Sequence, residues 1–114
     1  MNDNIIIKKE MRTLRYNRVS SITQNLDRQQ QNIEKYTYVF EDKCSGTQPL
    51  FDRKYGKYLK EYVEQDKVDE VSVHSIDRLA RNLRNLLEVI EFFHSHQVSL
   101  FIENLGMRTL VDGK

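Results

Sequence analysis

An arginine and a serine lie two residues apart near the start of the chain, in the tripeptide Arg18-Val19-Ser20. Alternate residues of a β-strand share a face, so the two side chains would point the same way. A strand predicted over residues 13–19 is followed at this point by a predicted helix. An arginine and the amides of a helix N-terminus together hold anions. The tripeptide therefore indicates an anion site, and the alternative is that Ser20 or Ser21 only caps the helix.

A second cluster, Asp77-Arg78-Leu79-Ala80-Arg81, lies at the predicted start of the most apolar helix. Arg78 and Arg81 are three residues apart, so both can face one ligand. Cations oppose the dipole at a helix N-terminus, and an anion should compensate them. That anion is either a bound phosphate or Asp77, and in the second case the cluster is a plain surface ion pair.

A third group is the segment from Asp42 to Gly46, followed by Arg53. We expect a loop over residues 42–52, because this stretch holds glycine and the single proline. Gly46 allows a tight backbone and Ser45 offers a hydroxyl, although an ordinary polar loop has the same composition. Cys44 has no histidine partner in a recognisable motif and is not a candidate nucleophile.

Patterns for metals and nucleotide cofactors are missing from the sequence. His94 and His96 would face apart on a helix, and His74 is distant from both. The chain has no paired-cysteine or HxxxH spacing, no phosphate loop and no GxGxxG. We therefore predict neither a metal nor a cofactor.

The elements that must position these clusters alternate between strands and helices. A capping box begins the first helix at Ser21, and Leu79 to Phe93 forms an apolar stripe on the last one. This order predicts an α/β fold of three layers: a mostly parallel sheet of four to five strands with helices on both faces. Functional groups of such sheets gather at the carboxyl ends of the strands. The expected strands cover residues 13–19, 35–41, 68–76 and 98–102, and helices begin near 21, 53 and 79.

Composition limits the domain count and the kind of partner. The 114 residues suffice for one domain, which we expect over residues 12–114 after a leader of residues 1–11. The net charge of +1 is not that of a stand-alone nucleic-acid binder. A single cysteine and the absence of long apolar runs favour a soluble cytoplasmic protein away from membranes.

The three clusters, in this order, resemble the catalytic domain of serine recombinases of the resolvase/invertase kind. The resemblance covers about residues 12–113, and agreement of three separated motifs favours the functional interpretation of each. The chain departs from the family pattern at Arg15 and Asn17, where the family usually has glycine and alanine. Two polar residues at these positions predict that one face of the strand is less buried than is usual in the family. The matching segments are Tyr16-Asn17-Arg18-Val19-Ser20-Ser21 with the helix from Gln24 to Gln29, Asp42 to Gly46 with Arg53, and Ser75 to Asn82.

The resemblance implies a role for each residue. Ser20 would be the nucleophile that attacks a DNA phosphate and leaves a 5′-phosphoserine bond, so neither ATP nor a metal is needed. Arg18, Arg78 and Arg81 would surround the phosphate, and Asp77 would orient them or assist proton transfer. The supporting pocket residues would be Gln24, Asp42, Ser45 and Arg53.

The resemblance also implies partners: double-stranded DNA, and in a full-length parent a homodimer that forms a synaptic tetramer. The long dimerisation helix and the DNA-binding domain of the family would follow Lys114 and are absent from this chain, so residues 1–114 alone would be inactive. Two alternatives remain: a recombinase-like module that no longer cuts and serves interaction or regulation, and a small doubly wound ligand-binding or signalling domain. The second would need an acidic phosphoacceptor pocket or a phosphate loop, and neither pattern is present.

Overall fold

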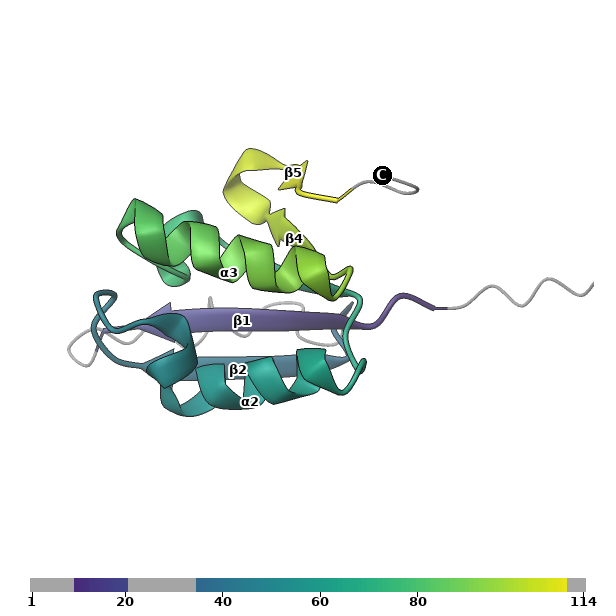
Figure 1. The fold of residues 1–114 in the computed structure, drawn as a ribbon, viewed down its shortest axis with the longest axis horizontal. Helices are drawn as coiled ribbons and strands as arrows, with labels where there is room; N and C mark the ends of the chain where they lie inside the picture. Colours follow the sequence, from purple (N-terminus) through teal and green to yellow (C-terminus); the bar gives the residue numbers. More distant parts are fainter. Residues whose placement is uncertain (1–9, 21–34, 111–114) are drawn as a thin grey trace, which may run out of the picture.

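The computed structural model describes residues 10–20 and 35–110 of the chain. Its centre is a five-stranded sheet in the order β2-β1-β3-β4-β5 (Figure 1). The first four strands are parallel and β5 is antiparallel to β4, which confirms the predicted mostly parallel α/β sheet. The strands are β1 (Thr13–Val19), β2 (Tyr38–Lys43), β3 (Glu70–Val73), β4 (Ser99–Ile102) and β5 (Met107–Arg108).

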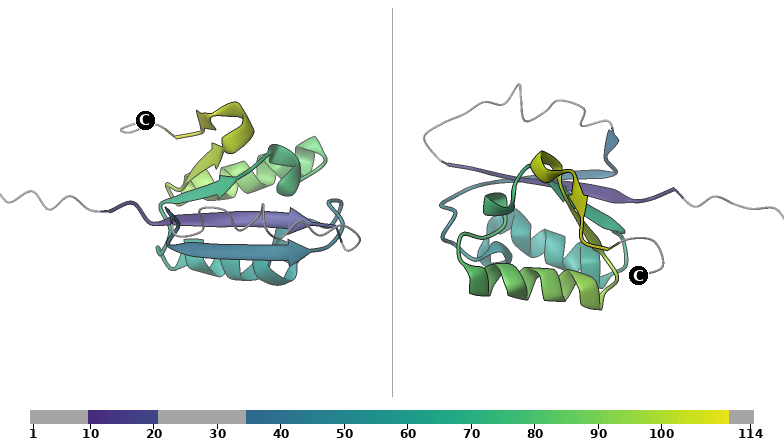
Figure 2. Two further views of the ribbon diagram at one scale, coloured as in Figure 1. Left: turned by 180° about the vertical axis from the view of Figure 1, so that it is seen from behind. Right: turned by 90° about the horizontal axis from the view of Figure 1, so that it is seen from above.

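Two α-helices connect the described strands, α2 (Lys54–Glu64) and α3 (Leu83–Ser95). Both lie on the same face of the sheet, as the two views of Figure 2 show. This placement follows from the strand order, because the connections from β2 to β3 and from β3 to β4 move in one direction and such crossovers are right-handed. The helix predicted from Ser21, which would cover the opposite face, lies outside the described residues. Among the described helices, none is long and apolar enough to span a membrane.

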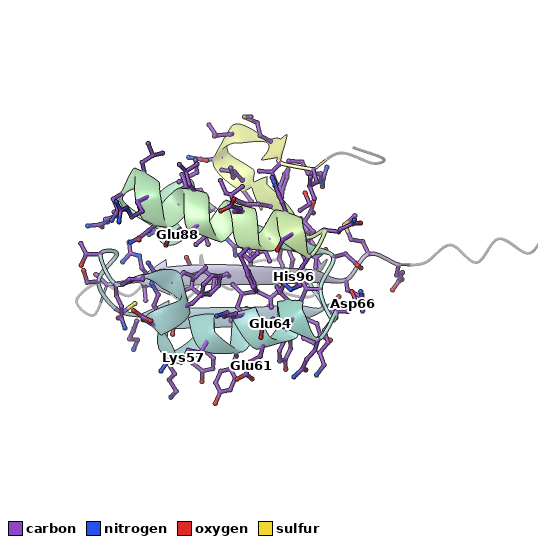
Figure 3. The ribbon with its side chains drawn as sticks, viewed as in Figure 1. Lys57, Glu61, Glu64, Asp66, Glu88 and His96 are labelled. Atoms are coloured by element: carbon purple, nitrogen blue, oxygen red, sulfur yellow. The ribbon has the colours of Figure 1, made fainter. Side chains whose placement is uncertain are left out.

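The hydrophobic core lies between the sheet and these two helices. Alternate residues of the strands point into it, since side chains alternate between the faces of a sheet. The outer faces of the helices are polar: Figure 3 shows the exposed side chains Lys57 and Glu61 on α2 and Glu88 on α3. The core residues from the strands are Leu14, Tyr16, Val71, Val73, Leu100 and Ile102, and those from the helices are Leu59, Val63, Val89 and Phe93.

The predicted start of the last helix was wrong. Residues Ile76–Arg78 form a short 3-10 turn, and α3 begins only at Leu83. Asn82 is the N-cap, and its side-chain oxygen accepts a hydrogen bond from the Asn85 amide at 2.8 Å. Arg78 and Arg81 are therefore on the segment between β3 and α3, where the macrodipole argument does not apply to them.

The predicted apolar stripe on this helix was also too wide. Leu79 is fully buried, but it lies before the helix, and Leu83 and Leu87 are 69% and 54% exposed. The face that packs on the sheet is centred on Val89 and Phe93. The four-residue delay in the helix start accounts for part of this error, because it removes Leu79 from the helical face.

Arg15 and Asn17 are more buried than their polarity predicted. The Arg15 side chain is 12% exposed and Asn17 is 6% exposed. The Arg15 guanidinium forms an ion pair with Glu103, with Nε 2.9 Å from Oε2. The Asn17 amide donates a hydrogen bond to Glu41 at 3.2 Å. Burial is tolerated because both polar groups have a carboxylate partner.

Candidate active site

The predicted site residues come from three segments that leave neighbouring strands at the carboxyl edge of the sheet. Arg18 is the second-last residue of β1, and Ser20 lies directly after the strand. Ser45 and Gly46 follow β2, and Asp77, Arg78 and Arg81 follow β3. Since β1 lies between β2 and β3, the three segments meet at this edge. Gln24 lies outside the described residues.

Arg18 lies at the centre of the site and is only 3% exposed. Its guanidinium donates one hydrogen bond, from Nη1 to the backbone oxygen of Cys44 at 3.0 Å. Its Nε is buried without a hydrogen-bond acceptor in the described part of the structure. Burial lowers the pKa of Arg18, and the charges of Arg81, Arg53 and Arg78 lower it further. Several positive charges thus lie close together at this edge of the sheet.

Arg78 shows a similar arrangement next to Arg18. Its Nη1 donates to the backbone oxygen of Arg18 at 3.3 Å, which places the two residues against each other. Its Nε is likewise buried and has no acceptor among the described residues. Buried N–H donors without an acceptor are costly, because nothing replaces the hydrogen bond that each would make to water. Two such donors at one place indicate that an anion belongs there.

Asp77 is exposed and supplies negative charge next to these arginines. It accepts a hydrogen bond from the Ser75 hydroxyl. That hydrogen bond lowers the pKa of Asp77, and the neighbouring charges of Arg78 and Arg18 lower it further. The carboxyl is therefore ionised at neutral pH. The charge of Asp77 therefore offsets only part of the positive charge of the neighbouring Arg18 and Arg78.

The two serines of the predicted site are both exposed. Ser20 follows the end of β1, two residues after Arg18. Ser45 instead helps to form the turn after β2: its hydroxyl is 2.8 Å from the Thr47 hydroxyl and accepts from the Thr47 amide at 3.2 Å. Ser20 is thus the exposed hydroxyl that follows β1 next to the buried arginine, whereas Ser45 has a local structural role.

Arg53 differs from the other arginines because its donors are already used. It is 1% exposed, and the five N–H groups of its guanidinium all point at described acceptors. The bonds connect the loop after β2 with the segment after β3, and no donor remains for a ligand. The acceptors are the backbone oxygens of Gly46, Gln48, Arg78 and Leu79, and the hydroxyl of Tyr16.

Asp42 lies within β2 and not in the predicted loop, and it is 3% exposed. Its carboxylate accepts hydrogen bonds from the amides of Tyr55 at 2.8 Å and Gly56 at 3.0 Å, in the first turn of α2. A carboxylate there satisfies amides that have no partner within the helix and interacts favourably with the dipole. Asp42 thus fixes α2 to the sheet.

Tyr16 joins these two residues, and sequence reasoning missed it. Its hydroxyl donates to Asp42 at 2.8 Å and lies 3.1 Å from Nη1 of Arg53, from which it accepts. Burial raises the pKa of Tyr16 above its ordinary value. A tyrosine on the core-facing side of a strand, two residues before a buried arginine, was the available signal. Within the described residues, no three histidine, cysteine, aspartate or glutamate side chains gather as metal ligands would.

Comparison with known proteins identifies the relatives of this chain. The family model described as "Resolvase, N terminal domain" matches residues 13–112. The C-terminal catalytic domain of ISC1926 TnpA, an IS607-like serine recombinase, is 28% identical with a TM-score of 0.70, over 82% of this chain and 69% of that one. A serine recombinase from Sulfolobus solfataricus is 25% identical with a TM-score of 0.68, over 83% and 69% of the two chains.

A further solved structure supports the fold alone. The N-terminal catalytic domain of TP901-1 integrase is 24% identical with a TM-score of 0.70, over 86% of this chain and 81% of that one. A search among curated proteins finds no significant match.

Proposed function

Because the chain belongs to the resolvase family and is the catalytic domain of a site-specific serine recombinase, we propose that the Ser20 hydroxyl cuts DNA and holds the cut strand as a 5′-phosphoserine. The observation that carries this proposal is the pair of buried Nε donors, on Arg18 and Arg78, that have no acceptor in the described structure. They lie at the strand edge where Ser20 follows β1.

The proposed reaction exchanges one phosphate ester for another. The Ser20 oxygen loses its proton and bonds to phosphorus, the bond from phosphorus to the 3′-oxygen breaks, and that oxygen leaves as a 3′-hydroxyl. Rejoining reverses these steps with a 3′-hydroxyl of the new partner strand. The ester bond is conserved throughout, so the exchange needs no nucleotide cofactor.

The arginines supply what this chemistry requires. Phosphoryl transfer spreads negative charge over the non-bridging oxygens, and catalysis is mostly positioning and electrostatic stabilisation. Guanidinium groups match phosphate geometry with paired N–H donors. We assign Arg18, Arg78 and Arg81 to the phosphate and Asp77 to their orientation. Arg53 and Asp42 act through Tyr16 and the backbone, and the supporting roles of Gln24 and Ser45 stay predictions.

The experiment that tests this function is capture of the covalent intermediate. The complete natural protein that contains residues 1–114 is incubated with DNA carrying its site, denatured, digested, and analysed by mass spectrometry for a nucleotide-bearing peptide. We expect the adduct on Ser20 with the DNA attached through its 5′-phosphate. An adduct on any other residue would contradict the assignment, and no adduct would favour the alternative of a module that no longer cuts.

Arg78→Lys and Arg81→Lys are each expected to reduce the cleavage rate by about 100-fold, the scale of losing one preorganised transition-state donor. Lysine keeps the charge but has no planar pair of donors. The measurement is the single-turnover rate of adduct formation. Arg84→Lys is the matched control, because Arg84 is exposed on α3, outside the site, and should be near wild type. Near-wild-type rates for both test variants would reduce Arg78 and Arg81 to surface charges.

Double-stranded DNA is the proposed substrate, but we expect residues 1–114 alone to bind it weakly at physiological salt. Affinity for a duplex grows with the number of phosphates neutralised, and the net charge is only +1. A DNA titration followed by fluorescence anisotropy measures this, with ultracentrifugation of the same sample for self-association. A tight, sequence-specific complex of residues 1–114 would contradict it. Homodimers, a synaptic tetramer and a cytoplasmic location remain proposals.

A further inference from the structure

The loop after β2 contains a buried glycine, Gly46, whose presence the backbone conformation does not explain. Among the glycines of residues 10–20 and 35–110, only Gly106 has a φ in the left-handed region, at 64°. Gly46 therefore has a conformation that alanine adopts without strain. The reason for glycine at this position must be the space around it.

That space is occupied by the side chain of Arg81. A Cβ added to Gly46 would lie 2.4 Å from Nε of Arg81, 2.9 Å from its Cδ and 3.0 Å from its Cζ. These are the three atoms nearest to that Cβ, and all belong to one side chain. Such distances are shorter than non-bonded contacts permit, since carbon atoms pack at about 3.5–4.0 Å. Arg81 thus runs across the bare backbone of Gly46.

The charge of Arg81 acts on Arg18, at the centre of the site. Arg81 is the arginine whose charge lowers the pKa of Arg18 most, ahead of Arg53 and Arg78. The backbone oxygen of Gly46 also accepts a hydrogen bond from Nη2 of Arg53 at 3.4 Å. The backbone of Gly46 is therefore held by Arg53 and lies against the side chain of Arg81.

We propose that Gly46 is a positioning residue: its missing side chain opens the path by which Arg81 reaches the phosphate next to Ser20. This inference rests on the proposed function, because it assumes that Arg81 acts on the DNA phosphate. It assigns to Gly46 a role in the reaction that is separate from folding. A methyl group at this position would displace the guanidinium and leave the backbone in place.

Gly56 provides the contrast that makes the inference testable. A Cβ added there would lie 1.8 Å from the backbone oxygen of Leu50 and 2.9 Å from its carbonyl carbon. A backbone atom cannot move aside as the end of a side chain can. We therefore expect Gly56→Ala to disturb the docking of α2, whereas Gly46→Ala only moves Arg81.

The test compares these variants in the complete natural protein. Gly46→Ala should reduce the single-turnover cleavage rate by about 100-fold, the effect of misplacing one transition-state donor, with DNA affinity and melting temperature near wild type. Gly56→Ala should instead lower the melting temperature. In a background of Arg81→Ala, adding Gly46→Ala should cause no further loss of rate, because interacting positions are not additive.

Two outcomes would overturn the inference. One is a wild-type cleavage rate in Gly46→Ala; the other is a full additional loss in the Arg81→Ala background, which would mean that Gly46 acts independently of Arg81. The residue that carries the DNA adduct is read separately by mass spectrometry and tests the proposed function. An adduct away from Ser20 together with non-additive rates would reject the nucleophile and retain the positioning of Arg81 by Gly46.

Discussion

Ser20→Ala is expected to reduce DNA cleavage by about 10⁴-fold or more, because removing a nucleophile leaves only the residual effect of the remaining site. DNA binding should stay close to wild type, since the exposed Ser20 contributes only one hydroxyl group. The melting temperature should also be unchanged, as the side chain is outside the core. The measurement is the rate of adduct formation next to a DNA titration of the same protein.

Ser21→Ala is the matched control for this variant, one residue further along the chain. It removes the same hydroxyl chemistry from the adjacent position and should cut DNA at a rate near wild type. If Ser20→Ala still cut DNA while Ser21→Ala did not, the nucleophile would be assigned one residue too early.

Arg53→Ala is expected to lower the free energy of unfolding by about 4 kcal/mol, the scale of breaking a buried hydrogen-bonded charge network. Four of the acceptors that Arg53 satisfies are backbone oxygens, which no compensating substitution can remove. Arg53→Lys should also be destabilising, since an ammonium group has three donors without the planar fork. Urea unfolding followed by circular dichroism gives the free energies.

Arg84→Ala is the control for Arg53, because it removes an exposed arginine from α3. Surface substitutions of this kind usually change stability by about 0.5 kcal/mol or less. An Arg53→Ala protein as stable as Arg84→Ala would show that the buried guanidinium is dispensable for folding, and that its place is in substrate binding.

The sheet and the edge that carries the site were predictable from local patterns. Alternating apolar residues in β1 and β3 specify strands, and a parallel sheet brings their carboxyl ends together whatever the loops do. Arg18, Ser20 and Arg78 could therefore be assigned to one edge. This inference needed only the period of the strands and the order of the elements.

The residue at which α3 begins could not be predicted from the local sequence. Asn82 is a good N-cap residue, but the apolar residue Leu79 suggested an earlier start of the helix, near residue 79. In the structure, Leu79 fills the core from the position directly after the 3-10 turn, and Asn82 caps the helix. The choice between two possible starts of a helix is decided by tertiary packing, and the local sequence does not encode it.

The roles of Arg53 and Arg15 depend on partners far away in sequence. Arg53 is held by the backbone oxygens of Arg78 and Leu79, more than twenty residues later, and Arg15 pairs with Glu103, 88 residues later. No periodicity encodes such pairs. The resemblance assigned Arg53 to the pocket, but only the positions of the loop carbonyls show that its donors face the protein.

The crowding of like charge around Arg18 has a consequence for the domain without its substrate. Burial lowers the pKa of Arg18, and repulsion from the charges of Arg81, Arg53 and Arg78 lowers it further, so the charged form of Arg18 is less favourable in the folded domain than in water. A phosphate that enters relieves this repulsion, and a ligand that binds only the native state stabilises it. We therefore expect a bound phosphate group to raise the stability of the domain. On this argument the domain is less stable without its ligand, and in return its arginines are already in position before the reaction begins. Such a trade-off between stability and activity is common at preorganised sites.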